Sequence, residues 1–219
     1  MKPLKVSLSS VCPLCGSQVS PFSSSGSRVF YRCGTCDLIH LSLAQRLSPE
    51  AEAERYRLHQ NHADDLNYRA FLDRLLQPLT EKLQKRDRGL DYGCGPGPAV
   101  EQMMRERGFE MNNYDPFFKP DRAVLDLNYD FITCTETAEH FYYPLKEFDL
   151  LNQMLKSGGW LGVMTGLYTQ STPFSSWYYA KDPTHVSIYT SQTMSWIAER
   201  YGWKPFFPSE NVVLFQKSR

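Results

Sequence analysis

The 219-residue sequence lacks a long, uninterrupted apolar run. Its most apolar stretches, such as residues 160–168, are broken by glycines and fall well short of the roughly 20 residues that a membrane-spanning helix needs. The first residues also lack the apolar segment of a secretory signal. These absences exclude a transmembrane helix and predict a cytoplasmic protein without a membrane partner.

The sequence also lacks an excess of charge of either sign. Lys plus Arg and Asp plus Glu both number 24, so the broad basic surface of a general nucleic-acid-binding protein is not expected. The distribution is uneven, because residues 1–48 carry five basic side chains against Asp37, a net charge of +4. Contact of this basic segment with RNA or an acidic partner therefore stays open, although such a modest patch is usually only a solvated surface.

Four of the six cysteines lie near the N-terminus, in two pairs with C-x2-C spacing separated by 17 residues. This spacing is typical of a structural zinc site, and the expected ligands are Cys12, Cys15, Cys33 and Cys36. Disulfides or free thiols are the alternative, which an intracellular location disfavours. We therefore predict a zinc-ribbon-like N-terminal module over residues 1–47, too small to be stable without Zn²⁺.

Residues 48–219 predict a second, larger domain that begins with a helical part at 48–87. Ser48 is a suitable N-cap before Pro49, and apolar residues over 71–83 recur with helical spacing around Pro78, which is expected to kink or split the helix. From residue 88 onward, short apolar strands alternate with amphipathic helices. This alternation predicts an α/β fold with a mostly parallel sheet, closed by a C-terminal hairpin that supplies an antiparallel last strand.

The stretch "GLDYGCGPGP" (residues 89–98) places glycines on alternate positions after a strand, which lets a ligand approach the backbone closely. Pro96 and Pro98 lack the backbone N–H groups that cradle phosphates, so a dinucleotide or a nicotinamide-dependent reductase is disfavoured. No Lys-Ser or Lys-Thr follows the glycines, which argues against a nucleoside triphosphate.

A ligand without phosphates suits this loop better. S-adenosylmethionine brings an amino group, which Asp91 can meet, and a ribose diol, which needs a carboxylate at the end of the next strand. Asp115 follows Gly95 by 20 residues, the distance expected for one strand–helix–strand step.

Because of these motifs, the chain resembles the class I S-adenosylmethionine-dependent methyltransferases. The resemblance rests on "LDYGCGPG", "YDP", "YDFITCTETAEHFYYP" and "LLNQMLKSGGWLGVMT", in that order, and covers about residues 50–217. It implies a Rossmann-like, seven-stranded sheet with the last strand antiparallel, although the region of the third strand is very short. The cofactor-binding residues that these considerations predict are Asp91, Gly93, Cys94, Gly95, Gly97, Asp115, Pro116, Thr135 and Glu136, together with Tyr68 and His59 from the preceding helical part.

Methyl transfer needs alignment of donor and acceptor, and a base only if the acceptor must lose a proton. His140 is the first candidate for that base, with a purely structural histidine as the alternative. His185 is the second, within an aromatic insertion at 175–189 that predicts an acceptor pocket or, alternatively, a packed loop. We expect a small-molecule acceptor rather than RNA or protein. The competing hypothesis is a zinc-ribbon adaptor whose cofactor-binding domain no longer catalyses.

Overall fold

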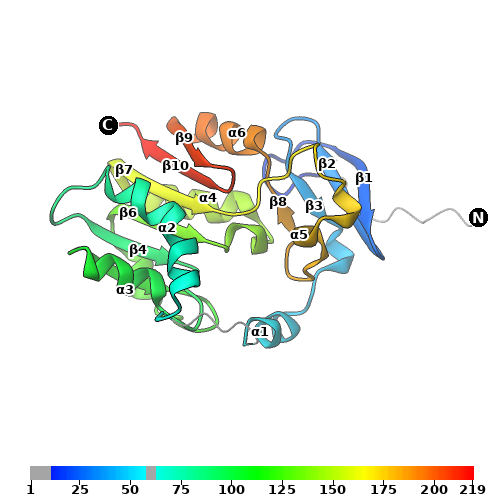
Figure 1. Cartoon of the computed structure of the whole chain (residues 1–219). Helices are drawn as coiled ribbons and strands as arrows, with labels where there is room; N and C mark the ends of the chain where they lie inside the picture. The colour runs from blue at the N-terminus through cyan, green and yellow to red at the C-terminus, as the bar shows by residue number, and fades with distance from the viewer. Residues whose placement is uncertain (1–10, 58–62) are drawn as a thin grey trace, which may run out of the picture.

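The computed structural model describes residues 11–57 and 63–219, which form two β-sheets and the helices around them (Figure 1). The larger sheet has the strand order β5-β4-β6-β7-β10-β9. Strands β5, β4, β6 and β7 run parallel to one another, and β10 runs antiparallel to both β7 and β9 beside it. The bounds are β4 (Arg88–Tyr92), β5 (Glu110–Tyr114), β6 (Tyr129–Thr135), β7 (Leu155–Met164), β9 (Trp203–Ser209) and β10 (Val212–Lys217).

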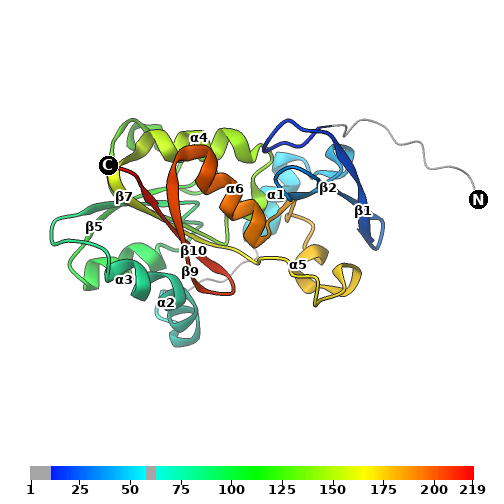
Figure 2. The same cartoon turned by 90° about the horizontal axis from the view of Figure 1, so that it is seen from above.

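Helices cover both faces of this sheet, as Figure 2 shows. Helices α2 (Leu66–Thr80) and α3 (Ala99–Glu106) lie on one face, and α4 (Pro144–Met154) and α6 (Ser191–Tyr201) lie on the other. The apolar side of α2 is fully buried, as its periodicity predicts, and it packs on β7 and β10. Pro78 does not split the helix, which continues to Thr80. The mostly parallel α/β fold and the antiparallel C-terminal hairpin are therefore confirmed.

The strand count differs from the seven that the resemblance implies, because the larger sheet has six strands among the described residues. The region expected to hold the third strand contains the 3-10 helix η2 (Arg122–Asp126) instead. Leu125 of this helix packs into the main core, and Tyr129 donates a hydrogen bond to the Val124 carbonyl at 2.7 Å. The segment between β5 and β6 is too short for a helix and a further strand. Instead, η2 packs beside β5 at the edge of the larger sheet.

The smaller sheet has the order β1-β2-β3-β8 and is antiparallel throughout. The N-terminal module supplies β1 (Val19–Ser25), β2 (Arg28–Cys33) and β3 (Ile39–Leu41), and the larger domain supplies β8 (Ser187–Ile188). The cores are also continuous, because Cys12, Leu14 and Leu38 belong to the same buried cluster as Tyr189 and Met194. The two parts of the chain therefore share both a sheet and a core.

The remaining helices connect these layers. They are η1 (Leu43–Gln45), α1 (Pro49–Arg57), η3 (Ala138–His140), η4 (Phe174–Ser176) and α5 (Tyr178–Lys181). In the part of the chain that the structure describes, no helix has the length and apolar character needed to span a bilayer.

Candidate functional site

A cavity of about 630 Å³ opens at the carboxyl ends of β4, β5 and β6, where open α/β sheets bind their ligands. Every predicted cofactor-binding or catalytic residue that the structure describes lines it. These residues are Tyr68, Asp91, Gly93, Cys94, Gly95, Gly97, Asp115, Pro116, Thr135, Glu136, His140 and His185. His59 lies outside the described residues. The sequence-based candidates thus converge on one cavity.

Asp91 lies at the end of β4, and only 3% of its surface is exposed. Its Oδ1 accepts a hydrogen bond from the Thr133 hydroxyl at 2.8 Å. Burial raises the pKa of Asp91 to about 7, against the opposing effect of the Thr133 hydrogen bond and with a smaller contribution from the charge of Asp115. A cationic group in the cavity would relieve this unfavourable burial of a carboxylate.

The glycine loop that follows β4 is a tight turn, and it is closely packed at Gly93. Gly93 has φ +84°, and a Cβ there would lie 2.2 Å from the Thr137 side chain, so no larger residue fits. The N–H groups of Gly93 and Cys94 both donate to the Tyr114 carbonyl, at 2.8 and 3.1 Å. Because these donors are already engaged and Pro96 has none, the loop offers few groups for a phosphate.

Asp115 follows β5, and its carboxylate is fixed by three backbone N–H groups. Oδ1 accepts from Phe117 at 2.8 Å and Phe118 at 3.1 Å, and Oδ2 accepts from Gly95 at 3.0 Å. A carboxylate oxygen can accept two hydrogen bonds, so Oδ2, which accepts only that of Gly95 among the described residues, keeps capacity for a ligand hydroxyl. The contact with Gly95 joins the two loops on which the cofactor site depends.

Thr135 and Glu136 at the end of β6 also face the cavity. The Thr135 hydroxyl is buried and has no hydrogen-bond partner among the described residues. Glu136 has φ +48°, which is unusual for a residue with a side chain. Burial, reinforced by the charge of Glu139, raises the pKa of Glu136 to about 9. Burial also raises the pKa of Tyr68, which closes the cavity from α2, to about 12.

Glu139, His140 and His185 meet at the end of the cavity formed by η3 and by the loop before β8. The rings of His140 and His185 lie 4.9 Å apart between centroids. Their Nδ1 atoms contact the carbonyls of Thr184 at 3.1 Å and of Tyr179 at 2.8 Å, respectively. Burial lowers the pKa of His185.

The aromatic insertion at 175–189 differs from its expected role as an acceptor pocket. Of residues 175–189, only His185 lines the cavity, whereas Tyr178 is 76% exposed. Trp177 packs instead against Phe174 and Tyr168, beside the N-terminal module. The insertion therefore mainly packs a loop, because its aromatic rings cover the apolar face of the smaller sheet.

Glu52 and Tyr56 of α1 line the cavity and were not predicted from the sequence. Tyr56 donates a hydrogen bond to Glu52 at 2.6 Å, and its ring packs edge-on against His140 with centroids 5.1 Å apart. Their spacing of four residues places them on one helix face, but nothing in the sequence indicates that this face lies over His140.

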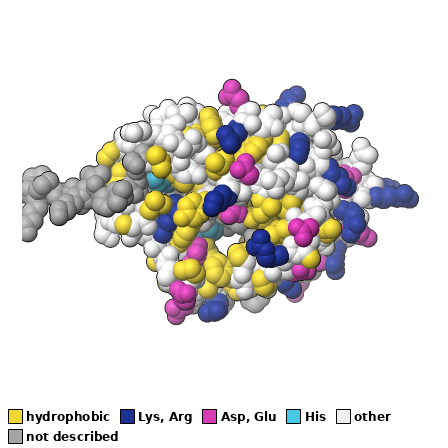
Figure 3. Space-filling view, turned by 180° about the vertical axis from the view of Figure 1, so that it is seen from behind, with side chains coloured by type: hydrophobic (Ala, Val, Ile, Leu, Met, Phe, Trp, Pro, Cys, Tyr) yellow, Lys and Arg dark blue, Asp and Glu magenta, His cyan; other side chains and the backbone are white. Residues whose placement is uncertain are grey.

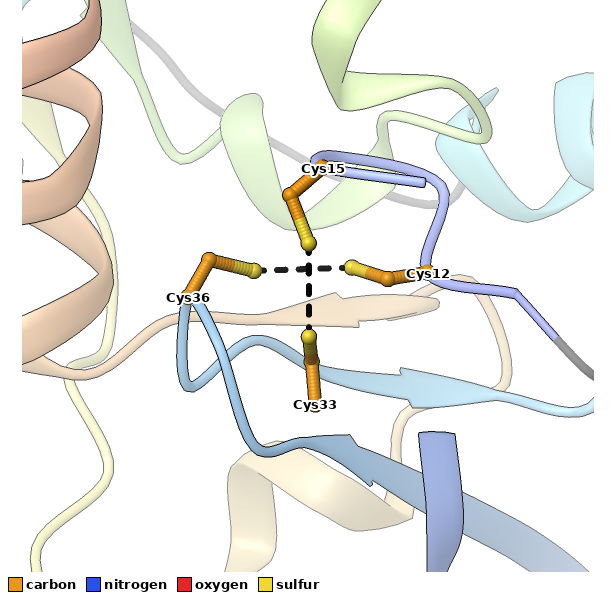
Figure 4. Close-up of side chains that lie close together, drawn as sticks. All are labelled: Cys12, Cys15, Cys33 and Cys36. Carbon is orange, nitrogen blue, oxygen red and sulfur yellow. Dashed lines mark hydrogen bonds between the residues drawn. The ribbon is translucent and has the colours of Figure 1, made fainter. Parts of the chain in front are cut away.

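The four cysteines of the N-terminal module converge as the C-x2-C spacing predicts (Figure 4). Their Sγ atoms lie within 4.8 Å of one another, with 3.5 Å between Cys12 and Cys36 and 3.3 Å between Cys15 and Cys33. All four are free thiols, not disulfides. Thiolates held at about 2.3 Å by a tetrahedral Zn²⁺ lie about 3.8 Å apart, so this donor set matches zinc closely.

The described basic side chains of the N-terminal module do not form a free surface patch, and Lys2 and Lys5 lie outside the described residues. Arg28 and Arg32 are engaged with backbone carbonyls and with Asp37, respectively, and Arg46 is stacked on Tyr142 and Tyr143. Figure 3 shows that Lys and Arg side chains instead gather at the opposite end of the molecule, over the larger sheet. The contact with RNA or an acidic partner that the sequence left open thus finds no support in the described residues.

Comparison with solved structures defines the class of fold. The chain is similar to the 1,6-didemethyltoxoflavin-N1-methyltransferase of Burkholderia thailandensis, solved with 1,6-didemethyltoxoflavin and S-adenosylhomocysteine, at TM-score 0.56 and 12% identity over 91% of this chain and 100% of that one. It is also similar to a SAM-dependent methyltransferase from Archaeoglobus fulgidus, at TM-score 0.50 and 19% identity over 71% of this chain and 74% of that one. The fold is that of S-adenosylmethionine-dependent methyltransferases.

The family follows from the sequence itself. Residues 62–205, more than half of the chain, match the family described as "Methyltransferase domain", and the chain belongs to this family. The sequence matches no curated protein. Family and fold together confirm the resemblance to class I S-adenosylmethionine-dependent methyltransferases.

Proposed function

We propose that this methyltransferase transfers the methyl group of S-adenosylmethionine to a small-molecule acceptor held in the same cavity. The observation that carries the proposal is the continuity of one cavity, from Asp91 and Asp115 at one end to His140 and His185 at the other. Its volume of about 630 Å³ lies within the range of about 300–1,000 Å³ usual for small-ligand pockets.

In this proposal Asp91 receives the amino group of the cofactor and Asp115 receives the ribose hydroxyls. Gly93, Gly95 and Gly97 let the cofactor approach the backbone. Cys94, Pro116, Thr135, Glu136 and Tyr68 form the remaining walls. His140 and His185 act on the acceptor, which must lie in line with the sulfur–methyl bond for displacement.

Three different elements contribute walls beside the two histidines, which favours a small acceptor over a polymer. These elements are helix α1, η3 and the loop before β8. The Burkholderia relative was solved with 1,6-didemethyltoxoflavin beside S-adenosylhomocysteine, which is consistent with this assignment.

We also propose that Cys12, Cys15, Cys33 and Cys36 bind one structural Zn²⁺. The support is the convergence of four free thiols at distances suited to a tetrahedral ion. Because free thiols persist in reducing compartments, the proposal places the protein in the cytoplasm.

The test is isothermal titration of the zinc-loaded protein with S-adenosylhomocysteine, followed by transfer of label from methyl-labelled S-adenosylmethionine to a panel of small acceptors. We expect binding that is lost in the Asp91→Asn, Asp115→Asn double variant, and labelled product from at least one acceptor. Binding without turnover on any acceptor would favour a non-catalytic adaptor. Absence of binding would refute the cofactor assignment.

A further inference from the structure

We propose that Glu139, His140 and His185 bind one divalent transition-metal cation at the acceptor end of the cavity. One ring nitrogen of each histidine and one carboxylate oxygen of Glu139 lie within 4.8 Å of one another. Within residues 11–57 and 63–219, the only other such group is formed by the four cysteines. The site is separate from the expected zinc of the N-terminal module, and it uses nitrogen and oxygen donors rather than sulfur.

One oxygen of the Glu139 carboxylate has no hydrogen-bond partner among the described residues. Glu139 is completely buried, and its Oε2 accepts a hydrogen bond from the Thr165 hydroxyl at 2.8 Å. Its Oε1 is also buried and has no hydrogen-bond partner in the described part of the chain. A buried carboxylate with a free oxygen is costly unless a donor or a cation satisfies it. A metal ion between Glu139 and the two imidazoles would do so.

The imidazole rings of His140 and His185 both turn Nδ1 toward a backbone carbonyl. Both Nδ1 atoms contact backbone carbonyls, which only accept hydrogen bonds, so Nδ1 carries the proton in each neutral ring. The lone pair therefore lies on Nε2 of both His140 and His185. A histidine whose second nitrogen donates to a carbonyl is the usual arrangement for a metal ligand. Two adjacent rings show it independently here.

The donor set indicates which cations fit. Two imidazole nitrogens and one carboxylate oxygen suit Zn²⁺, Fe²⁺ or Mn²⁺, and three protein ligands leave coordination positions open toward the cavity. Ligand atoms held at about 2.1 Å from a tetrahedral ion lie about 3.4 Å apart. The three donor atoms lie within 4.8 Å of one another, so modest side-chain movements would bring them around one ion.

The consequence for the reaction rests on the proposed methyl transfer and concerns the class of acceptor. A cation at this place would bind an acceptor hydroxyl and lower its pKa, so that its proton leaves to water. The resulting oxygen attacks the methyl carbon: the O–C bond forms, the C–S bond breaks, and its electron pair stays on sulfur. The products are a methyl ether, S-adenosylhomocysteine and one proton, so no oxidant or reductant is needed. The expected acceptor is therefore a hydroxyl-bearing small molecule.

The experiment counts metal ions per chain after equilibrium dialysis of the zinc-loaded protein against Zn²⁺ or, separately, Mn²⁺. We expect wild-type protein to gain one Zn²⁺ beyond that of the cysteines, or one Mn²⁺. In the Glu139→Gln and His185→Gln variants we expect at least a tenfold loss of affinity. Thr165→Val, which removes the hydroxyl that orients Glu139 and also bonds the Tyr179 hydroxyl, is expected to weaken binding by about 10–100-fold.

Glu147→Gln is the matched control, because Glu147 is another carboxylate of the same cavity but lies outside the three-residue group. It should bind the added ion with unchanged affinity. Titration of each variant with S-adenosylhomocysteine tests the methyltransferase proposal independently of the metal-site proposal. No additional ion, with S-adenosylhomocysteine still bound, overturns the metal site and leaves the methyltransferase proposal standing. An additional ion that survives Glu139→Gln and His185→Gln also overturns it.

Discussion

The guanidinium of Arg28 lies 2.6 Å from the backbone carbonyl oxygen of His185. Arg28 belongs to β2 of the N-terminal module, and it also donates to the carbonyls of Ala180 at 2.7 Å and Asp182 at 2.6 Å. One side chain of the module thus holds the loop that carries His185 into the cavity. The module therefore acts as a support for the acceptor end of the site.

Replacing Arg28 should loosen this loop without touching the cofactor. We expect Arg28→Ala to lower the free energy of unfolding by about 3 kcal/mol, because several hydrogen bonds to a charged donor are lost. Methyl transfer should fall, while affinity for S-adenosylhomocysteine should change less than threefold. Urea unfolding and isothermal titration measure the two effects.

Arg28→Lys is the matched control for charge. It keeps the cation but loses the planar fork of donors. We therefore expect its free energy of unfolding to lie between those of wild type and Arg28→Ala. Equal unfolding curves for Arg28→Ala and wild type would show that the carbonyl contacts do not hold the loop.

Cofactor binding should depend on pH through Asp91. Burial raises the pKa of this carboxyl to about 7, so below pH 7 a proton must leave before the carboxylate meets the cofactor's ammonium group. Affinity for S-adenosylhomocysteine should therefore fall with decreasing pH, approaching tenfold per pH unit well below 7. In Asp91→Asn, binding should be weak and should lose this dependence. A wild-type affinity that is constant between pH 5.5 and 7 would contradict the assignment.

The same shift of the Asp91 pKa predicts how the stability of the free protein varies with pH. The unfolded carboxyl ionises near 3.8 and the folded one near 7, so the folded state binds more protons between these values. The contribution of Asp91 to stability is fully present below pH 3.8 and is lost as the pH rises through 7. Comparing the unfolding free energies of wild type and Asp91→Asn across this window isolates the contribution.

Removal of zinc should destabilise the whole chain and not only the N-terminal module. Cys12, Cys33 and Cys36 belong to the same buried cluster as Met194 and Phe215, so the two parts should unfold together. We expect Cys36→Ser to lower the melting temperature while calorimetry still shows a single transition. Cys94→Ala, which changes a cysteine outside the cluster of four, should keep the zinc ion of that cluster. A separate early transition of the module would argue for independent folding.

Two glycines of the cofactor loop should respond differently to the same substitution. Gly93→Ala places a Cβ 2.2 Å from Thr137 and also forces φ +84° on a residue with a side chain. Gly95→Ala meets nothing within 4 Å, so only the strain of φ +64° remains, about 1–2 kcal/mol. Affinity for S-adenosylhomocysteine should therefore fall more in Gly93→Ala. A larger loss of affinity in Gly95→Ala than in Gly93→Ala would show that the Thr137 side chain moves easily away from the added Cβ.

Local patterns in the sequence predicted most of the fold. The spacing of leucines in α2, the strand–glycine turn at 89–98 and the C-terminal hairpin all depend on residues close in the chain. The third strand was expected only from the resemblance, and a segment that is too short forms η2 instead. The convergence of the four cysteines was predictable because C-x2-C pairs set their geometry locally.

Features that depend on distant contacts were not predictable. Nothing in Ser187–Ile188 indicates that this two-residue strand pairs with β3, because the pairing depends on how the module docks. For the same reason the sequence did not show that Glu52 would face His140, or that Glu139 would be buried with a free oxygen. The aromatic insertion suggested a pocket by composition, but its rings mainly serve packing.

The shared strand β8 also affects how the chain is made. The ribosome releases β1, β2 and β3 before Ser187–Ile188, which follow β3 by about 145 residues. Throughout that interval the edge at Ile39–Leu41 has no neighbour and stays open to pairing with other chains. Early capture of the metal by the nascent cysteines would shorten this exposure, so translation in zinc-starved cells should yield aggregates rather than a stable, metal-free enzyme.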